Sequence, residues 1–385
     1  MTAIASSGRL DLETLVMARL AQEIHQLGNL AEGRELARAA VAVARELGDP
    51  GLSVRALMGL AWTLNHLDHR DERGEVVEEM LECAERSGEA ELDLVASEWR
   101  CASLLEAGCT EDLDIELARL DELAKLAPVP AQLVRIETLR TARVLLSGDL
   151  DGGVELAGET YKMSLAYEPG MADQVFRAQM LVPLREKGLI ATVLPLVNEM
   201  VAAFPDIPGW RCALAFVLSE AGDRRAAEEL ISDIFESGLD VIPRDFSWGH
   251  SIAMLSEAVA NCDRADVAPL LIDELVPFSG LSLPLWFIVG GAAVDHYLGR
   301  LTLITGNAEG AVAYLDRAVE FHERAGAVPF LLRSRIELSR AQHLVGVAQV
   351  GGTIDLRGTA HQARDAGLES IASLAEAPPS AVAAY

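Results

Sequence analysis

The feature that most constrains the fold is the regular return of glycine-containing turns between segments of helical periodicity. Turns recur roughly every 20 residues, including Gly48-Asp49-Pro50, Gly148-Asp149, Gly222-Asp223 and Gly306-Asn307. Between them, apolar residues recur at i, i+3, i+4 and i+7, as in 226–235, where an apolar stripe faces Glu, Ser and Asp. Two such helices form a hairpin of roughly 40 residues, a period typical of helical solenoids.

Composition supports helices over sheets. Half of the residues are hydrophobic but only 5% are aromatic, so the core must be built from Ala, Leu and Val. Sheets favour β-branched and aromatic side chains, whereas Ala and Leu are strong helix formers. The sequence therefore predicts an all-α protein.

Two hairpins share a fixed spacing of small residues. Gly299 and Ala311 are twelve residues apart, as are Ala215 and Ala227. A further seven residues separate Ala311 from Ala318, and the same number separates Ala227 from Ile234. Antiparallel helices approach closely only where small residues face each other, so we expect Gly299 to face Ala311. This spacing resembles the tetratricopeptide repeat (TPR). It implies a right-handed superhelical solenoid of about nine hairpins, which we expect to start near Leu12, Pro50, Glu89, Pro130, Ala172, Pro208, Ser247, Leu285 and Val328.

No composition shift marks a domain boundary. We therefore expect one repeat array over 10–377, with its best-matched part at 205–345. Residues 1–9 are small and polar, and 378–385 begin with Pro-Pro-Ser, so both are expected to be flexible ends.

Longer runs carry a more specific resemblance. They are similar to runs in the helical-repeat region of large actinobacterial regulators, a MalT-like region that accompanies ATPase, adenylate-cyclase or LuxR-type modules. The runs are Ile207–Ala215, Ile242–Trp248, Ala293–Leu301 and His322–Leu331. The resemblance implies a sensor or scaffold segment without catalysis, because no GxxxxGK[ST] loop and no recognition-helix pattern accompany these runs.

Charge and cysteine usage exclude several classes of function. The chain has 32 basic and 59 acidic residues, a net charge of -27 that repels phosphate backbones and anionic membranes. The five cysteines form no CxxC pair, so they predict reduced thiols in a cytoplasmic protein. We find no spacing typical of a metal site or a cofactor and expect neither.

The candidate binding residues are His296, Arg300 and Trp286. His296 and Arg300 are four residues apart on the first helix of the clearest hairpin, and the TPR-like geometry turns them toward the concave groove. A cationic pair on an inner wall can hold a carboxylate or phosphate. The alternatives are a solvated groove wall or a salt bridge to the next helix. As surface residues, both should tolerate replacement by alanine without loss of folding.

The preferred hypothesis is a non-enzymatic interaction scaffold or regulatory protein that binds a protein or peptide in the concave groove. The alternative is a small-molecule sensor, or an atypical enzyme of specialised metabolism, with its ligand near His296, Arg300 and Trp286. An enclosed apolar pocket favours the alternative, and an open polar groove favours the scaffold. No catalytic residue is predicted.

Overall fold

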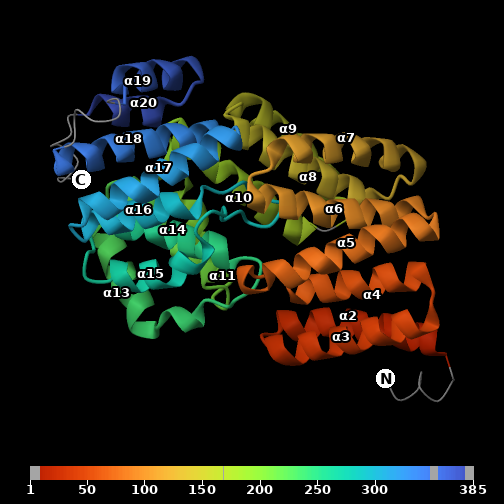
Figure 1. Ribbon diagram of the computed structural model, residues 1–385. Helices are drawn as coiled ribbons and strands as arrows, with labels where there is room; N and C mark the ends of the chain where they lie inside the picture. Colours follow the sequence, from red (N-terminus) through yellow and green to blue (C-terminus); the bar gives the residue numbers. More distant parts are fainter. Residues whose placement is uncertain (1–8, 168, 347–353, 378–385) are drawn as a thin grey trace. The chain divides into compact units, whose positions relative to one another are not determined.

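The computed structural model describes residues 9–167, 169–346 and 354–377. This part of the chain forms nineteen α-helices, four short 3-10 helices and no strand, only two isolated β-bridges (Figure 1). The prediction of an all-α helical-repeat protein is confirmed. The flexible ends were predicted mostly on 1–8 and 378–385, which lie outside the described residues.

The chain divides into two compact units. Unit 1 comprises 1–104, 112–136 and 244–246, and unit 2 comprises 105–111, 137–243 and 247–385. The first seven α-helices of the described chain are α2 (Leu10–Gln26), α3 (Leu30–Leu47), α4 (Pro50–Thr63), α5 (Arg70–Ser87), α6 (Ala90–Ala107), α7 (Thr110–Leu126) and α8 (Pro130–Ser147). The remaining helices are α9 (Leu150–Ser164), α10 (Pro169–Glu186), α11 (Leu194–Ala203), α12 (Gly209–Glu220), α13 (Arg224–Ser237), α14 (Trp248–Asn261), α15 (Ala268–Leu275), α16 (Val294–Ile304), α17 (Ala308–Arg324), α18 (Val328–Val345), α19 (Leu356–Asp365) and α20 (Glu369–Glu376). The 3-10 helices are η1 (Leu67–His69), η2 (Ile190–Val193), η3 (Leu239–Val241) and η4 (Val276–Phe278).

Glycine and a capping residue act together at the turns. Gly222 has a φ of 83°, which an L side chain rarely adopts, and the next residue, Asp223, caps α13 by accepting a hydrogen bond from the Ala226 N–H. Asn307 caps α17 in the same way after Gly306. These pairs explain why a Gly-Asp or Gly-Asn signal in the sequence locates a helix start.

Eight of the nine predicted hairpin starts lie within three residues of a helix start. The exception is the start expected near Leu285, because α16 begins at Val294. The preceding segment folds back on itself through antiparallel bridges that join Ser282 to Ala293 and Leu285 to Val289. A Cβ on Gly291 would lie 2.1 Å from the Leu283 carbonyl oxygen, so only glycine fits this crossing.

Hairpin packing follows the predicted small-residue spacing with one difference. A Cβ on Gly299 would lie 2.5 Å from the Leu315 side chain, so α17 presses a leucine against this glycine instead of the predicted Ala311. Ala311 is nevertheless fully buried one turn away. Gly299 therefore has its predicted role of allowing the two helices to pack closely, but the residue that faces it is a leucine and not an alanine.

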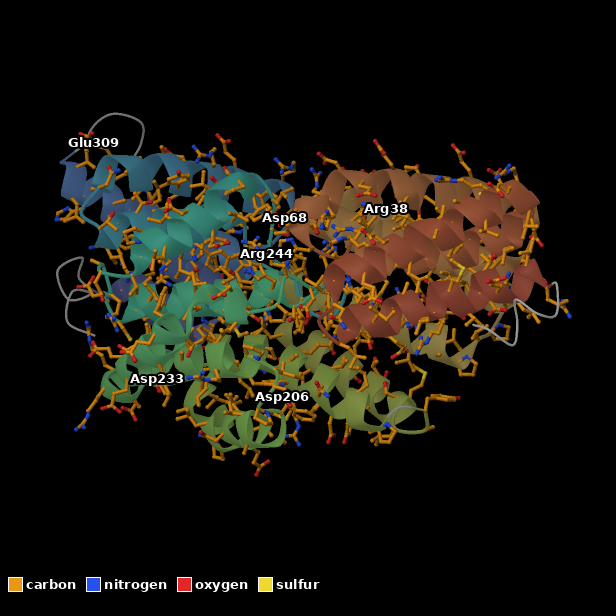
Figure 2. The ribbon with its side chains drawn as sticks, turned by 90° about the horizontal axis from the view of Figure 1, so that it is seen from below. Arg38, Asp68, Asp206, Asp233, Arg244 and Glu309 are labelled. Carbon is orange, nitrogen blue, oxygen red and sulfur yellow. The ribbon has the colours of Figure 1, made fainter. Side chains whose placement is uncertain are left out.

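Within unit 1, ion pairs join successive hairpins. Arg38 pairs with Glu72, Arg45 with Glu79, and Arg55 with Glu89, and the partners of each pair are 34 residues apart. These pairs are offset from equivalent positions, because the helices α2, α4, α6 and α8 begin 40 residues apart along the chain. The period of roughly 40 residues expected from turn spacing is therefore confirmed here. Figure 2 shows Arg244 and Asp68, which form a further ion pair of unit 1 at 3.2 Å.

Within unit 2, hairpins that are far apart in the sequence contact each other. Arg333 of α18 forms two hydrogen bonds, of 3.0 and 2.9 Å, with the carboxylate of Glu186 on α10. A hydrophobic cluster likewise combines Leu145 and Leu150 with residues of α18, α19 and α20. The inner faces of these hairpins are therefore packed as a core.

None of the helices described is long and apolar enough to cross a membrane. All five cysteines are free thiols, and all except the partly exposed Cys109 are buried, where they pack as small core residues.

Candidate functional site

The structure places His296 and Arg300 in the interior of unit 2. His296 is 1% exposed, and the Arg300 side chain is 14% exposed. The expectation that both face an open groove is therefore wrong, because neighbouring first helices cover that wall. The alternative of a salt bridge to the next helix is confirmed, since both side chains contact Glu257 on α14.

Trp286 does not lie on the helix that carries these two residues. It belongs to the segment before α16, where its φ of 47° is unusual for a residue with a side chain. Its ring packs on Phe287 with a centroid separation of 4.1 Å. The ligand role of the three residues stays a prediction.

Glu257 is the centre of a network that we name the charge ladder. Its carboxylate accepts hydrogen bonds from Arg185 (2.7 Å) and Arg300, and it lies 3.3 Å from His296 Nε2. Arg185 also holds Glu220 at 2.9 Å, and Arg300 lies 3.5 Å from Glu337. The complete ladder consists of Arg185, Glu186, Glu220, Glu257, Arg300, Arg333, Glu337 and Arg340.

The ladder follows the first helices of successive hairpins. Its members lie on α10, α12, α14, α16 and α18. Arg185 and Glu220 are 35 residues apart, and Arg300 and Glu257 are 43 apart. His296 and Arg300 thus lie on the face of α16 that was predicted to line the inner wall. Charged side chains from neighbouring repeats cover that face.

Electrostatics keep the ladder ionised. Burial opposes ionisation of Glu257, but Arg185 and Arg300 outweigh burial and hold its pKa well below the usual value. Burial likewise raises the pKa of Glu220, and the stronger combined effect of Arg185 and Arg333 lowers it to about 2. Four arginines therefore face four glutamates, and the ladder as a whole is neutral.

A chain of hydrogen bonds through two buried histidines ends on the ladder. The Ala293 N–H donates to His322 Nε2 at 2.8 Å, which leaves the His322 proton on Nδ1, 3.1 Å from Ser334 Oγ. Ser334 then donates to His296 Nδ1 at 2.8 Å, and His296 Nε2–H points to Glu257. Every donor thus has one acceptor when both rings are neutral.

The pKa directions agree with neutral rings. Burial lowers the pKa of His322 well below its usual value, and the neighbouring His296 adds to this effect. Burial also lowers the pKa of His296, although Glu257 partly offsets it. Ser334 has the hydrogen-bond pattern of a Ser–His–Glu triad, but its side chain is fully buried. We therefore interpret the chain of bonds as structural.

A small cavity adjoins the ladder. It has a volume of about 60 Å³ and is lined by Arg185, Glu257, His250 and Tyr297 together with apolar side chains. None of His296, Arg300 and Trp286 is among the residues that line it. Within the described chain, no group of three or more His, Cys, Asp or Glu residues is placed to hold a metal ion.

Sequence reasoning missed Glu257, Arg185, Glu220 and His250. A signal for the first three was present, since charged residues interrupt otherwise apolar first helices at 35- and 37-residue steps. That signal becomes visible only once each first helix has been assigned and aligned with the next.

Comparison with known protein families found no family model that matches the chain. Comparison with curated proteins found no match either. Among solved structures, the chain is similar to a protein described as "Circular tandem repeat protein with novel repeat topology and enhanced subunit contact surfaces". The two share 14% identity over 95% of this chain and 93% of that chain, with a TM-score of 0.22. A likeness at that TM-score supports no conclusion about this chain. The all-α repeat fold thus stands on the helices themselves, and the resemblance to actinobacterial regulators remains a prediction.

Proposed function

We propose that this chain is a non-enzymatic interaction scaffold that binds a basic segment of a protein partner. The observation that carries this proposal is the separation of charge between interior and surface. The buried ladder is balanced, so the net charge of -27 lies on the remainder of the chain, mainly at the surface. An acidic surface attracts a basic partner and raises its association rate.

The partner surface that we propose differs from the concave groove expected from the sequence. In unit 2 the inner wall is a packed core, so solvent-facing second helices are the available surface. On α5 of unit 1, five exposed carboxylates recur at steps of four and three residues. We name them the α5 stripe: Asp71, Glu75, Glu78, Glu82 and Glu85.

The geometry of the α5 stripe favours an elongated partner. Steps of four and three residues place all five carboxylates on one face of the helix, over roughly 21 Å at 1.5 Å per residue. A helix or extended segment that presents Lys or Arg along its length matches this row. The resemblance to regulator repeats also supports a scaffold role.

The test is affinity capture from cell extract with the complete chain, quantified by mass spectrometry. The variant Glu75→Lys/Glu78→Lys/Glu82→Lys reverses the α5 stripe. The control Glu309→Lys/Asp316→Lys/Glu320→Lys makes the same change of charge at exposed positions of α17 in unit 2; Figure 2 labels Glu309. We expect a specific partner to be lost from the first variant and retained by the second. Equal loss in both variants shows non-specific attraction and rejects the α5 stripe, and retention in both rejects it directly.

A further inference from the structure

The cavity beside the charge ladder has the composition of a ligand site. Its apolar lining includes Leu181 of α10, Phe216 of α12, Met254 of α14 and Phe330 of α18. The polar groups Arg185, Glu257 and His250 converge on the same space. Small-molecule sites are typically apolar cavities with a few fixed polar groups.

His250 supplies a hydrogen-bond acceptor that the protein itself does not use. The ring has a hydrogen bond with the backbone of Leu283 that favours its protonated form, so the ring is the donor. In the described part of the chain, Nδ1 is buried and has no hydrogen-bond partner. Burial lowers the pKa of His250 to about 4, so Nδ1 carries a free lone pair at neutral pH. A buried polar atom without a partner is costly unless a ligand or water satisfies it.

The charge balance of the ladder restricts the charge of a ligand. Arg185 and Glu257 face the cavity, but each is already held by opposite charges within the ladder. A charged ligand would add an unbalanced charge to a buried space, which is strongly unfavourable. The ladder therefore favours an uncharged occupant.

The volume restricts the size of the occupant. At roughly 15 Å³ for each water-sized centre, 60 Å³ holds about four non-hydrogen atoms. This is smaller than the cavity of about 150 Å³ that admits benzene in another protein. An aromatic metabolite or a nucleotide does not fit.

We propose that this cavity binds an uncharged small molecule of about four non-hydrogen atoms, with a short apolar group and a hydroxyl or amide that donates to His250 Nδ1. The site lies between the first helices of successive hairpins, so its occupant contacts α10, α12, α14 and α18 together. This moves the small-molecule alternative from His296, Arg300 and Trp286 to His250, and it is independent of the α5 stripe.

The test uses three probes of equal heavy-atom count on the complete chain. 2-Propanol is neutral and donates a hydrogen bond, acetone is neutral and only accepts, and acetate is an anion. Binding is followed by the methyl resonance of Met254, which lines the cavity, in protein labelled with ¹³C-methyl methionine. Met80, buried in unit 1, is the internal control. We expect 2-propanol to shift Met254 saturably in the millimolar range, with acetone at least about tenfold weaker and acetate inactive, because one hydrogen bond contributes about a factor of ten.

Three variants assign the effect to the site. His250→Leu should weaken 2-propanol about tenfold, whereas His250→Gln, which keeps an acceptor, should recover part of the affinity. Ala253→Leu fills the cavity and should abolish the shift, and Ala202→Leu, at an exposed position of α11, should not. Equal binding of acetone and 2-propanol, or unchanged binding by His250→Leu, overturns the role of His250. Preferred binding of acetate overturns the charge argument, and a Met254 resonance that no probe moves shows that the cavity holds water alone.

Discussion

Two buried glutamates, each on the first helix of a hairpin, have different numbers of basic partners in the two units. Glu98 on α6 of unit 1 is 7% exposed and Glu257 on α14 of unit 2 is 5% exposed, so their burial is similar. Glu98 has one arginine, Arg135, at 3.4 Å, and within the described residues its Oε1 has no hydrogen-bond partner. Glu257 has two arginines and a histidine.

The difference in partners reverses the sign of the pKa shift. Burial raises the pKa of Glu98 to about 7, because Arg135 offsets only part of the desolvation. Arg185 and Arg300 hold the pKa of Glu257 well below its usual value despite the same burial. The number of basic partners, and not the degree of burial, therefore decides whether a buried carboxyl group in this fold is ionised. Unit 1 can neutralise its glutamate by protonation, and unit 2 cannot.

The largest effect should come from removing an arginine of the ladder. Arg185→Met leaves Glu220 and Glu257 short of positive charge and should destabilise unit 2 by about 3–5 kcal/mol, the usual cost of breaking a buried ion pair. The matched change Arg135→Met should cost less than about 1 kcal/mol at pH 7, because Glu98 can take up a proton. Hydrogen exchange of the α14 and α6 segments measures each cost. Equal losses in the two segments contradict the comparison.

The second effect is a pH dependence that belongs to Glu98. Its folded pKa of about 7 exceeds the unfolded value of about 4.5, so wild-type stability falls as pH rises between these values. Glu98→Gln removes that loss and should gain about 2–3 kcal/mol relative to wild type between pH 4.5 and pH 8. Glu257→Gln should instead destabilise throughout this range, since it leaves two arginines underbalanced. Urea unfolding of both variants at several pH values gives the two curves, and a flat difference for Glu98→Gln excludes its protonation.

The third effect concerns the hydrogen-bond chain of unit 2. Ser334→Ala leaves the His322 Nδ1–H and His296 Nδ1 without the hydroxyl that joins them, at an expected cost of about 2 kcal/mol. Ser256→Ala is the control, because the Ser256 hydroxyl donates only to Ile252 O of its own helix at 2.7 Å and should cost under about 1 kcal/mol. Thermal unfolding compares the two. A similar small loss in both variants shows that the histidines do not depend on Ser334.

The sequence predicted the helices well because local physics determines them. A Gly-Asp turn, an N-cap and an apolar stripe act within one or two helical turns, so Asp223 and Asn307 were readable before any packing was known. The failure at Leu285 arose because the apolar segment before α16 folds onto itself, and apolar runs alone do not distinguish a buried loop from a helix.

The environment of the candidate site was harder to predict from the sequence, because it depends on which other repeats pack against it. His296 and Arg300 were placed on the correct face of the correct helix, but their exposure depends on α10, α14 and α18. The expectation that alanine at both positions leaves folding intact no longer follows, since Glu257 would lose two of its three partners. Contacts between residues more than 140 positions apart, such as Arg333 and Glu186, leave no trace in local periodicity.

The smallest loss of stability should come from the surface ion pairs of unit 1. It tests whether ion pairs between repeats contribute the same free energy when they are exposed as when they are buried. Arg38 and Arg45 pair with Glu72 and Glu79 at the same kind of repeat-to-repeat contact as Arg185 with Glu220, but their side chains are 49% and 56% exposed. Water and salt screen such charges, so Arg38→Ala and Arg45→Ala should each cost no more than about 0.5 kcal/mol and less still in 1 M salt. Urea unfolding at low and high salt measures this. A cost near that of Arg185→Met would mean that ion pairs between repeats contribute equally whatever their burial. The contrast between the two units would then have to come from packing and not from charge.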